Sequence, residues 1–184
     1  GLDNPFFGAM NDGITAQAED RGVEVEVQAA ASLDDTTGQA DRIATLAGQD
    51  FDCFIVNPIS ETNLVQPLAD VAETEAPIVN IDLPVATDAA EQVGATIGTY
   101  IGTDNVAAGG LGADFVNEQL GGEGSVALIG GIDGDPTSQA RLDGFSEGVA
   151  DGIEIVTTVP GDWDRQTALT QAETILTSNP DLDA

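Results

Sequence analysis

The 184-residue chain carries 33 acidic and 4 basic side chains, which gives a formal net charge of -29, and it contains no histidine. A surface this negative repels nucleic-acid backbones and anionic lipid headgroups, so neither is expected as an electrostatic partner of this chain. The hydrophobic share of 41% is typical of a globular domain, and these residues include neither an apolar run that could span a membrane nor an export signal.

The acidic residues are spread along the whole chain, and all four basic residues are arginines. Repulsion between so many like charges destabilises a compact state at low ionic strength, whereas molar salt shortens the Debye length to about 3 Å. The composition therefore predicts adaptation to high salt and a halophilic source. The alternative is an acidic protein of a mesophile.

A helix is predicted at the start of the chain. Asn4 can cap it, and Pro5 suits the first helical position. An apolar stripe with helical spacing follows and ends near Gly22. The stripe consists of Phe7, Met10, Ile14 and Ala18.

The rest of the chain alternates between strand and helix patterns. Strands are predicted at 23–29, 51–58, 76–84, 95–105, 125–131 and 153–161. Helices are predicted within 34–48, 61–73, 104–120, 137–150 and 165–178. This alternation is typical of an α/β fold with parallel sheets.

Two of these strands have distinctive patterns. The segment 23–29, VEVEVQA, alternates at period two, which predicts a strand with one wet face near the edge of a sheet. The segment 51–58, FDCFIVNP, is continuously apolar, which predicts a strand buried on both faces. Cys53 is then expected to be a small buried hydrophobe, and the alternative is a reactive thiol.

Polar residues follow several of the apolar strands. In open parallel sheets, ligands bind outside the carboxyl ends of the strands. Asn57, Asp82, the segment 103–105 and the segment 132–133 all occupy such positions. Taken singly, they can be explained as turn formers or helix caps, as for Asp104. Their repetition at one edge of a sheet favours a binding site.

Aromatic residues recur at the same edge. Phe6 lies one step off the apolar stripe, whereas Phe7 lies on the stripe and suits the core equally well. Trp163 follows the strand 153–161. Aromatic rings beside carboxylates, amides and arginine suit a sugar, whose C–H faces pack on rings while its hydroxyls form hydrogen bonds. Arg141 is either a solvated surface charge or a forked donor toward such a ligand.

The sequence shows no pattern of a catalytic, metal-binding or cofactor site. Without histidine, it lacks the commonest general base and metal ligand. No nucleophile elbow, P-loop or EF-hand pattern occurs, and the glycine groups do not match a dinucleotide fingerprint. The chain is therefore predicted not to be an enzyme.

Several motifs, in order from end to end, resemble the periplasmic sugar-binding proteins of ABC transporters, specifically the ribose-binding-like cluster. They are DNPFFGAMNDGI at 3–14, NPIS at 57–60, NID at 80–82, IGTDNVAAGG at 101–110, GGIDGDPTSQARLDGF at 130–145, DWDRQTA at 162–168 and NPDLDA at 179–184. The resemblance implies two doubly wound parallel-sheet lobes of the type I periplasmic binding protein fold. It implies an N-terminal lobe at 1–102 without its first strand and part of a C-terminal lobe at 103–184, so that the chain is a fragment, incomplete at both ends.

The resemblance also implies roles in the first lobe. Asn4 would bind ligand hydroxyls, and Phe6 and Phe7 would flank the sugar ring. Asp82 would accept hydrogen bonds from hydroxyls, and Asn57 would shape the floor of the pocket.

Further implied roles involve the crossover and the second lobe. Thr103 would place a small hydroxyl near the crossover between the lobes. Arg141 would donate to sugar oxygens, and Trp163 would stack on the face opposite the phenylalanines. Ribose binders commonly have arginine after the matched aspartate, whereas this chain has Leu83, which argues against ribose itself.

The function implied by the resemblance is capture of a pentose or hexose by lobe closure, for delivery to ABC permease subunits in the membrane. Such a protein would be extracytoplasmic, in the periplasm or on the cell surface with a lipid anchor, and monomeric. The alternative is the ligand-sensing domain of a transcription regulator of the lactose repressor type, with a DNA-binding segment before Gly1. A third class, a sugar-modifying or nucleotide-using enzyme, would need catalytic residues beyond this chain.

Overall fold

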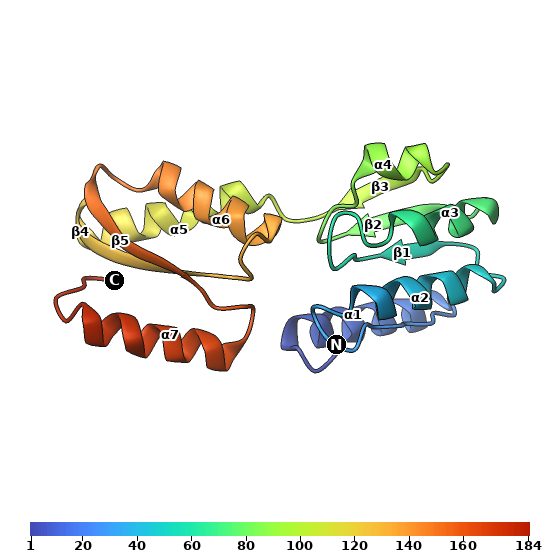
Figure 1. Ribbon diagram of the computed structural model, residues 1–184, viewed down its shortest axis with the longest axis horizontal. Helices are drawn as coiled ribbons and strands as arrows, with labels where there is room; N and C mark the ends of the chain where they lie inside the picture. The colour runs from blue at the N-terminus through green and yellow to red at the C-terminus, as the bar shows by residue number, and fades with distance from the viewer. The chain divides into compact units, whose positions relative to one another are not determined.

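The computed structural model describes residues 1–184, which form two compact units, Gly1–Gly102 and Thr103–Ala184 (Figure 1). The first unit contains α1 (Pro5–Arg21), α2 (Thr36–Ala47), β1 (Phe54–Val56), α3 (Val65–Glu73), β2 (Ile78–Ile81), α4 (Thr87–Gln92) and β3 (Ile97–Ile101). The second contains α5 (Asn105–Leu120), β4 (Glu123–Gly130), α6 (Pro136–Gly148), β5 (Gly152–Pro160) and α7 (Arg165–Ser178). All strand pairs are parallel, so the predicted α/β class is confirmed.

The first unit is built on a three-stranded sheet in the order β1-β2-β3. Phe54 and Val56 of β1 and Ile78 of β2 share one buried cluster with side chains of α3. The α3 members include Leu68 and Val71, both fully buried. Each such side chain contributes roughly 1.5–3 kcal/mol by leaving water. This core fixes the two strands whose carboxyl ends carry the predicted polar residues.

Helix α1 begins and ends as the sequence predicts. The Asn4 side chain accepts a hydrogen bond from the Phe6 amide, Pro5 occupies the first turn, and Gly22 closes the helix with φ of 66°. That left-handed conformation suits glycine, which has no Cβ to clash. The residues of the predicted stripe are only half-buried, and no residue of α1 is fully buried.

The predicted strand at 23–29 is absent, so that prediction is wrong. Its alternation is present, but Val23, Val25 and Val27 are all exposed, and the segment 24–29 makes no backbone hydrogen bond to any strand of residues 1–184. A strand pattern specifies a sheet only where a neighbouring strand can pair with it. Within these residues, β1 pairs with β2 alone.

Strand β1 is shorter than predicted and is not buried on both faces. Phe54 and Val56 are 4% and 3% exposed, whereas Ile55 between them is 55% exposed. Cys53 is exposed too, which contradicts its prediction as a buried hydrophobe. Successive side chains of a strand point to opposite faces, and only the face of Phe54 and Val56 is covered in this unit.

Helix α4 was not predicted from the sequence. It has six residues, and its N-cap position is Ala86, which provides no capping side chain. The usual start signal of a helix is therefore missing. Its single buried residue, Ala90, joins the core of the first unit.

The second unit has a two-stranded parallel sheet of β4 and β5. Figure 1 shows α5 and α6 on one side of this sheet and α7 on the other. Each helix starts at an aspartate whose side chain accepts a hydrogen bond from a backbone amide of the first turn: Asp104 for α5, Asp135 for α6 and Asp164 for α7. The prediction of Asp104 as a helix cap is thus confirmed.

Helices α5 and α6 approach each other at two buried glycines. A Cβ on Gly109 of α5 would lie 2.0 Å from the carbonyl oxygen of Arg141. A Cβ on Gly144 of α6 would lie 2.0 Å from the carbonyl oxygen of Val106. Because no real Cβ tolerates such a distance, the two backbones contact each other only because both positions are glycine. This close contact fixes the start of α5 against the middle of α6, where Arg141 lies.

Candidate binding site

In the first unit, the structure brings together two of the predicted site residues at the carboxyl ends of β1 and β2. Asn57 directly follows β1, and Asp82 directly follows β2. The Asn57 side-chain amide donates to a carboxylate oxygen of Asp82 over 3.1 Å. Both side chains are half-buried. An amide and a carboxylate therefore lie side by side at the edge of the sheet where ligands bind in folds of this class.

Asp82 is less exposed to solvent than almost every other acidic residue of the chain. All acidic side chains except Asp35, Asp82 and Asp135 are exposed. Asp35 and Asp135 cap α2 and α6 through hydrogen bonds from backbone amides. Asp82 caps no helix, so helix capping does not explain why it is sheltered.

The backbone of Asp82 is held by β3. Its φ is 61°, in the left-handed region. Its amide donates to the Ile101 carbonyl over 2.9 Å, and its carbonyl accepts a hydrogen bond from the Tyr100 hydroxyl. Burial, with the negative charge of Asp82 as a second cause, raises the pKa of Tyr100 above its ordinary value, so the hydroxyl keeps its proton at neutral pH.

A buried asparagine shapes the loop around Asp82. Asn80 is 2% exposed, and its side-chain amide donates to the carbonyls of Val56 over 3.1 Å and Leu83 over 2.9 Å. Its side-chain oxygen accepts from the Val85 amide over 2.8 Å. Asn80 therefore ties the loop after β2 to the end of β1. It lies in the NID motif, and this structural role was not predicted from the sequence.

A second polar network holds the backbone at Asn57 and in the loop that follows it. The Gln39 side chain donates to the Asn57 carbonyl over 2.8 Å. Its oxygen accepts from the Ile59 amide over 2.9 Å and from the Asn63 side chain over 2.8 Å. Gln39 and Asn63 were not predicted, because nothing in the sequence indicates that α2 reaches the loop after β1.

The residues at the start of α1 form a separate pair of rings. Phe6 and Phe7 pack edge to face with centroids 5.1 Å apart and an interplanar angle of 81°. Phe6 is 55% exposed and Phe7 is half-buried. The Asn4 side-chain oxygen is used in capping, which leaves its amide group for other contacts. No hydrogen bond joins Asn4 to Asn57 or Asp82.

In the second unit, the structure brings Arg141 and Trp163 together. The guanidinium carbon lies 5.8 Å from the centroid of the Trp163 ring, a cation–π geometry. The Arg141 Nε donates to the Asn105 side-chain oxygen over 2.8 Å. No protein acceptor engages its other two nitrogens, although the chain is rich in carboxylates. Thr103 is exposed, and its carbonyl accepts from the Asn105 side chain over 3.2 Å.

Trp163 has a backbone and a packing that fix its position. Asp162 and Trp163 have φ of 57° and 53°, which non-glycine residues seldom adopt. A Cβ on Gly131 would lie 2.2 Å from the Trp163 ring, so a glycine directly after β4 makes room for the indole. Asp164 caps the next helix, and the hydrogen bonds from Thr167 hold the pKa of this carboxyl below its ordinary value.

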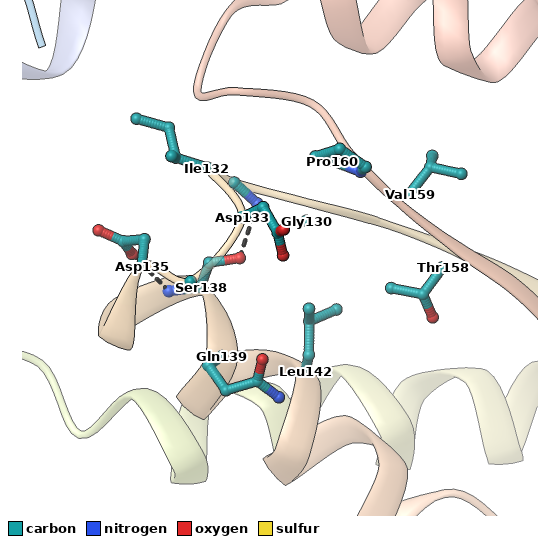
Figure 2. A pocket seen from close by; sticks show the side chains of 12 residues that line it. Gly130, Ile132, Asp133, Asp135, Ser138, Gln139, Leu142, Thr158, Val159 and Pro160 are labelled. Carbon is teal, nitrogen blue, oxygen red and sulfur yellow. Dashed lines mark hydrogen bonds between the residues drawn. The ribbon is translucent and has the colours of Figure 1, made fainter. Parts of the chain in front are cut away.

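A small pocket lies between the loop after β4, the first turn of α6 and the end of β5 (Figure 2). The Gly131 amide donates to the Ser138 hydroxyl at its base over 2.7 Å. The predicted edge residues Ile132 and Asp133 line the pocket. Its volume of about 90 Å³ is below the roughly 300–1,000 Å³ of ordinary small-molecule sites, so it does not provide a sugar site by itself.

The structure lacks both a metal-ion cluster and a membrane-spanning helix. It contains no group of three or more acidic or cysteine side chains arranged to hold a metal ion. None of its helices has both the length and the apolar character that crossing a bilayer requires.

Comparison with known proteins gives matches along the whole chain. The D-allose-binding periplasmic protein of Escherichia coli K12 is 35% identical over 186 residues, covering 100% of this chain and 60% of that protein. The ribose import binding protein of Bacillus subtilis is 30% identical over 183 residues, covering 100% of this chain and 57% of that protein. The chain thus spans about 60% of the length of these curated relatives.

A solved structure also matches the whole chain. An ABC transporter solute-binding protein from Actinobacillus succinogenes with bound D-allose matches with a TM-score of 0.93 and 27% identity, over 100% of this chain and 64% of that one. The fold is therefore that of the type I periplasmic binding proteins. The family described as periplasmic binding protein domain matches residues 1–184, and the chain belongs to that family.

Proposed function

We propose that the protein is an extracytoplasmic solute-binding protein that captures a monosaccharide, a pentose or hexose, for uptake by an ABC transporter, and that it is not an enzyme. The observation that carries the proposal is the chemistry at the strand ends. The Asn57–Asp82 pair offers a sheltered carboxylate, and the Arg141–Trp163 pair offers free guanidinium donors beside a ring. These groups suit sugar hydroxyls and sugar C–H faces, and the relatives described above are named for binding D-allose and ribose.

In the proposed complex, each unit contributes one part of the site. Asp82 accepts from sugar hydroxyls, with Asn57 at the pocket floor, while Asn4, Phe6 and Phe7 provide an amide and apolar rings. Arg141 donates through its two free nitrogens, Trp163 packs against the ring, and Thr103 provides a hydroxyl. A ligand that contacts both units only when they close favours the closed form by its differential affinity, and that form would engage the permease.

The identity of the residue after Asp82 narrows the choice of sugar. Leu83 is 6% exposed, so its side chain lies in the protein interior. The first unit therefore offers the carboxylate of Asp82 without a neighbouring basic group at this position. This arrangement favours a sugar other than ribose. The names of the relatives also favour sugar capture over a transcription regulator of the lactose repressor type.

The binding proposal is tested with the full-length protein by calorimetric titration against D-allose, D-ribose and other monosaccharides. Asp82→Ala and Phe6→Ala are expected to weaken binding of the best ligand at least tenfold, by about 1.4 kcal/mol or more, without unfolding the protein. Asp70→Ala and Phe115→Ala are matched controls, because both residues are exposed and lie on α3 and α5. Unchanged affinity would remove the substituted residue from the site, and a wild-type protein that binds no monosaccharide would refute the function.

We further propose that the acidic surface is an adaptation to high salt. All but three acidic side chains are exposed, so their mutual repulsion depends directly on screening by salt. Dialysis of the full-length protein from molar to millimolar salt is expected to unfold it. Circular dichroism measures the loss of helix, and a spectrum unaffected by dialysis would contradict the proposal.

A further inference from the structure

Two consecutive residues of β3 hold Asp82 on both sides of its Cα. Its amide donates to the carbonyl of Ile101, and its carbonyl accepts from the hydroxyl of Tyr100. Asp82 lies just beyond the paired residues Ile81 and Ile101, where the ladder of β2 and β3 ends. The backbone bond to Ile101 therefore extends the strand pairing by one residue, and the side-chain bond from Tyr100 adds a second hold on the peptide groups that flank the Asp82 side chain.

A glycine allows the hydroxyl of Tyr100 to reach Asp82. A Cβ on Gly102 would lie 2.0 Å from that hydroxyl, so the glycine makes room for the phenol. The ring is 45% exposed and belongs to no buried cluster. Core packing therefore does not account for a tyrosine here, whereas the hydrogen bond to Asp82 does. Tyr100 is the only tyrosine among the 184 residues.

The conformation of Asp82 requires such support. Its φ of 61° is uncommon for a residue with a side chain, although aspartate adopts it more readily than most. The direction of the carboxylate follows from this backbone conformation and from the hydrogen bond to Asn57. If the backbone relaxed to negative φ, the carboxylate would leave its present position relative to the edge of the sheet.

We propose that Tyr100 is a positioning residue for sugar binding, whose hydroxyl holds Asp82 in the left-handed conformation that aims its carboxylate at the ligand. This inference rests on the proposed function for its effect on affinity. Its structural part, control of the Asp82 backbone by one hydroxyl, is independent of the ligand.

The test removes the hydroxyl alone. Tyr100→Phe in the full-length protein is expected to lower affinity for the best-binding monosaccharide about three- to tenfold, with the unfolding midpoint nearly unchanged. Thr99→Val is the matched control, because Thr99 is the exposed neighbour on β3 and its hydroxyl makes no hydrogen bond. In the Asp82→Ala background, Tyr100→Phe is expected to cause no additional loss, since the carboxylate it positions is gone. An equal loss in both backgrounds, or no loss in either, would overturn the proposal.

A crystal structure of the Tyr100→Phe variant separates this inference from the proposed function. A negative φ at Asp82 is the expected result, and an unchanged left-handed Asp82 would overturn the role of Tyr100. This measurement needs no ligand, so it decides the inference even if no monosaccharide binds the wild-type protein.

Discussion

Gly144→Ala is expected to destabilise the protein by about 3 kcal/mol, the upper part of the range for overpacked sites. The added Cβ would lie 2.0 Å from the carbonyl oxygen of Val106. That oxygen belongs to the backbone of α5 and cannot rotate away, so the two helices must separate. The gain in helix propensity from glycine to alanine, about 1 kcal/mol, offsets only part of the cost. Denaturant unfolding of the full-length protein in constant high salt measures the difference.

Gly112→Ala is the matched control for this experiment. Gly112 lies in the partner helix α5, and its Cβ would meet only the Phe145 ring of α6, at 3.6 Å, an ordinary contact. The control is expected to leave stability unchanged or to raise it by about 0.5–1 kcal/mol. Equal stability of the two variants would mean that α5 and α6 do not meet at Gly144.

Asn80→Asp is expected to destabilise the protein by about 3–5 kcal/mol at neutral pH, although it changes one nitrogen to oxygen. The Asn80 amide donates to the carbonyls of Val56 and Leu83 in a buried site. A carboxylate there would place negative charge against those oxygens, and both would lose their donor. Denaturant unfolding in constant high salt again measures the loss.

Asn11→Asp is the control for the change from amide to carboxylate. Asn11 lies in α1, is half-buried, and makes no side-chain hydrogen bond. Its replacement is expected to alter stability by no more than about 0.5 kcal/mol. If Asn80→Asp behaved in the same way, the Asn80 side chain would not tie the loop to β1.

Most helices could be located from the sequence because their start signals are local. Asn4 with Pro5, and Asp104 at the start of α5, act on amides within three residues. The missing strand at 23–29 and the exposed Cys53 could not be foreseen, because both outcomes depend on which strand or helix covers a given face. A period-two pattern states that one face is apolar, but it does not state what the strand pairs with.

The residues of the candidate site likewise fall into those that could be predicted from the sequence and those that could not. The positions of Asn57 and Asp82 follow from the rule that polar residues after parallel strands meet at one edge, and the structure joins them by a hydrogen bond. The supporting residues were missed because their partners are distant in sequence: Gln39 and Asn57 are 18 residues apart, and Asn105 and Arg141 are 36 apart. An amide in an α/β chain has many candidate partners, and only the packed structure selects one.

If the acidic surface is the adaptation to high salt proposed above, the distribution of acidic side chains makes salt dependence and ligand recognition separable properties. Thirty of the 33 carboxylates face solvent, and of the remaining three only Asp82 lies at the proposed site. Replacing many of the exposed carboxylates by lysine is then expected to shift the salt concentration that the folded protein requires. Ligand selectivity is expected to be retained, because the groups proposed to contact the ligand are not among those exchanged.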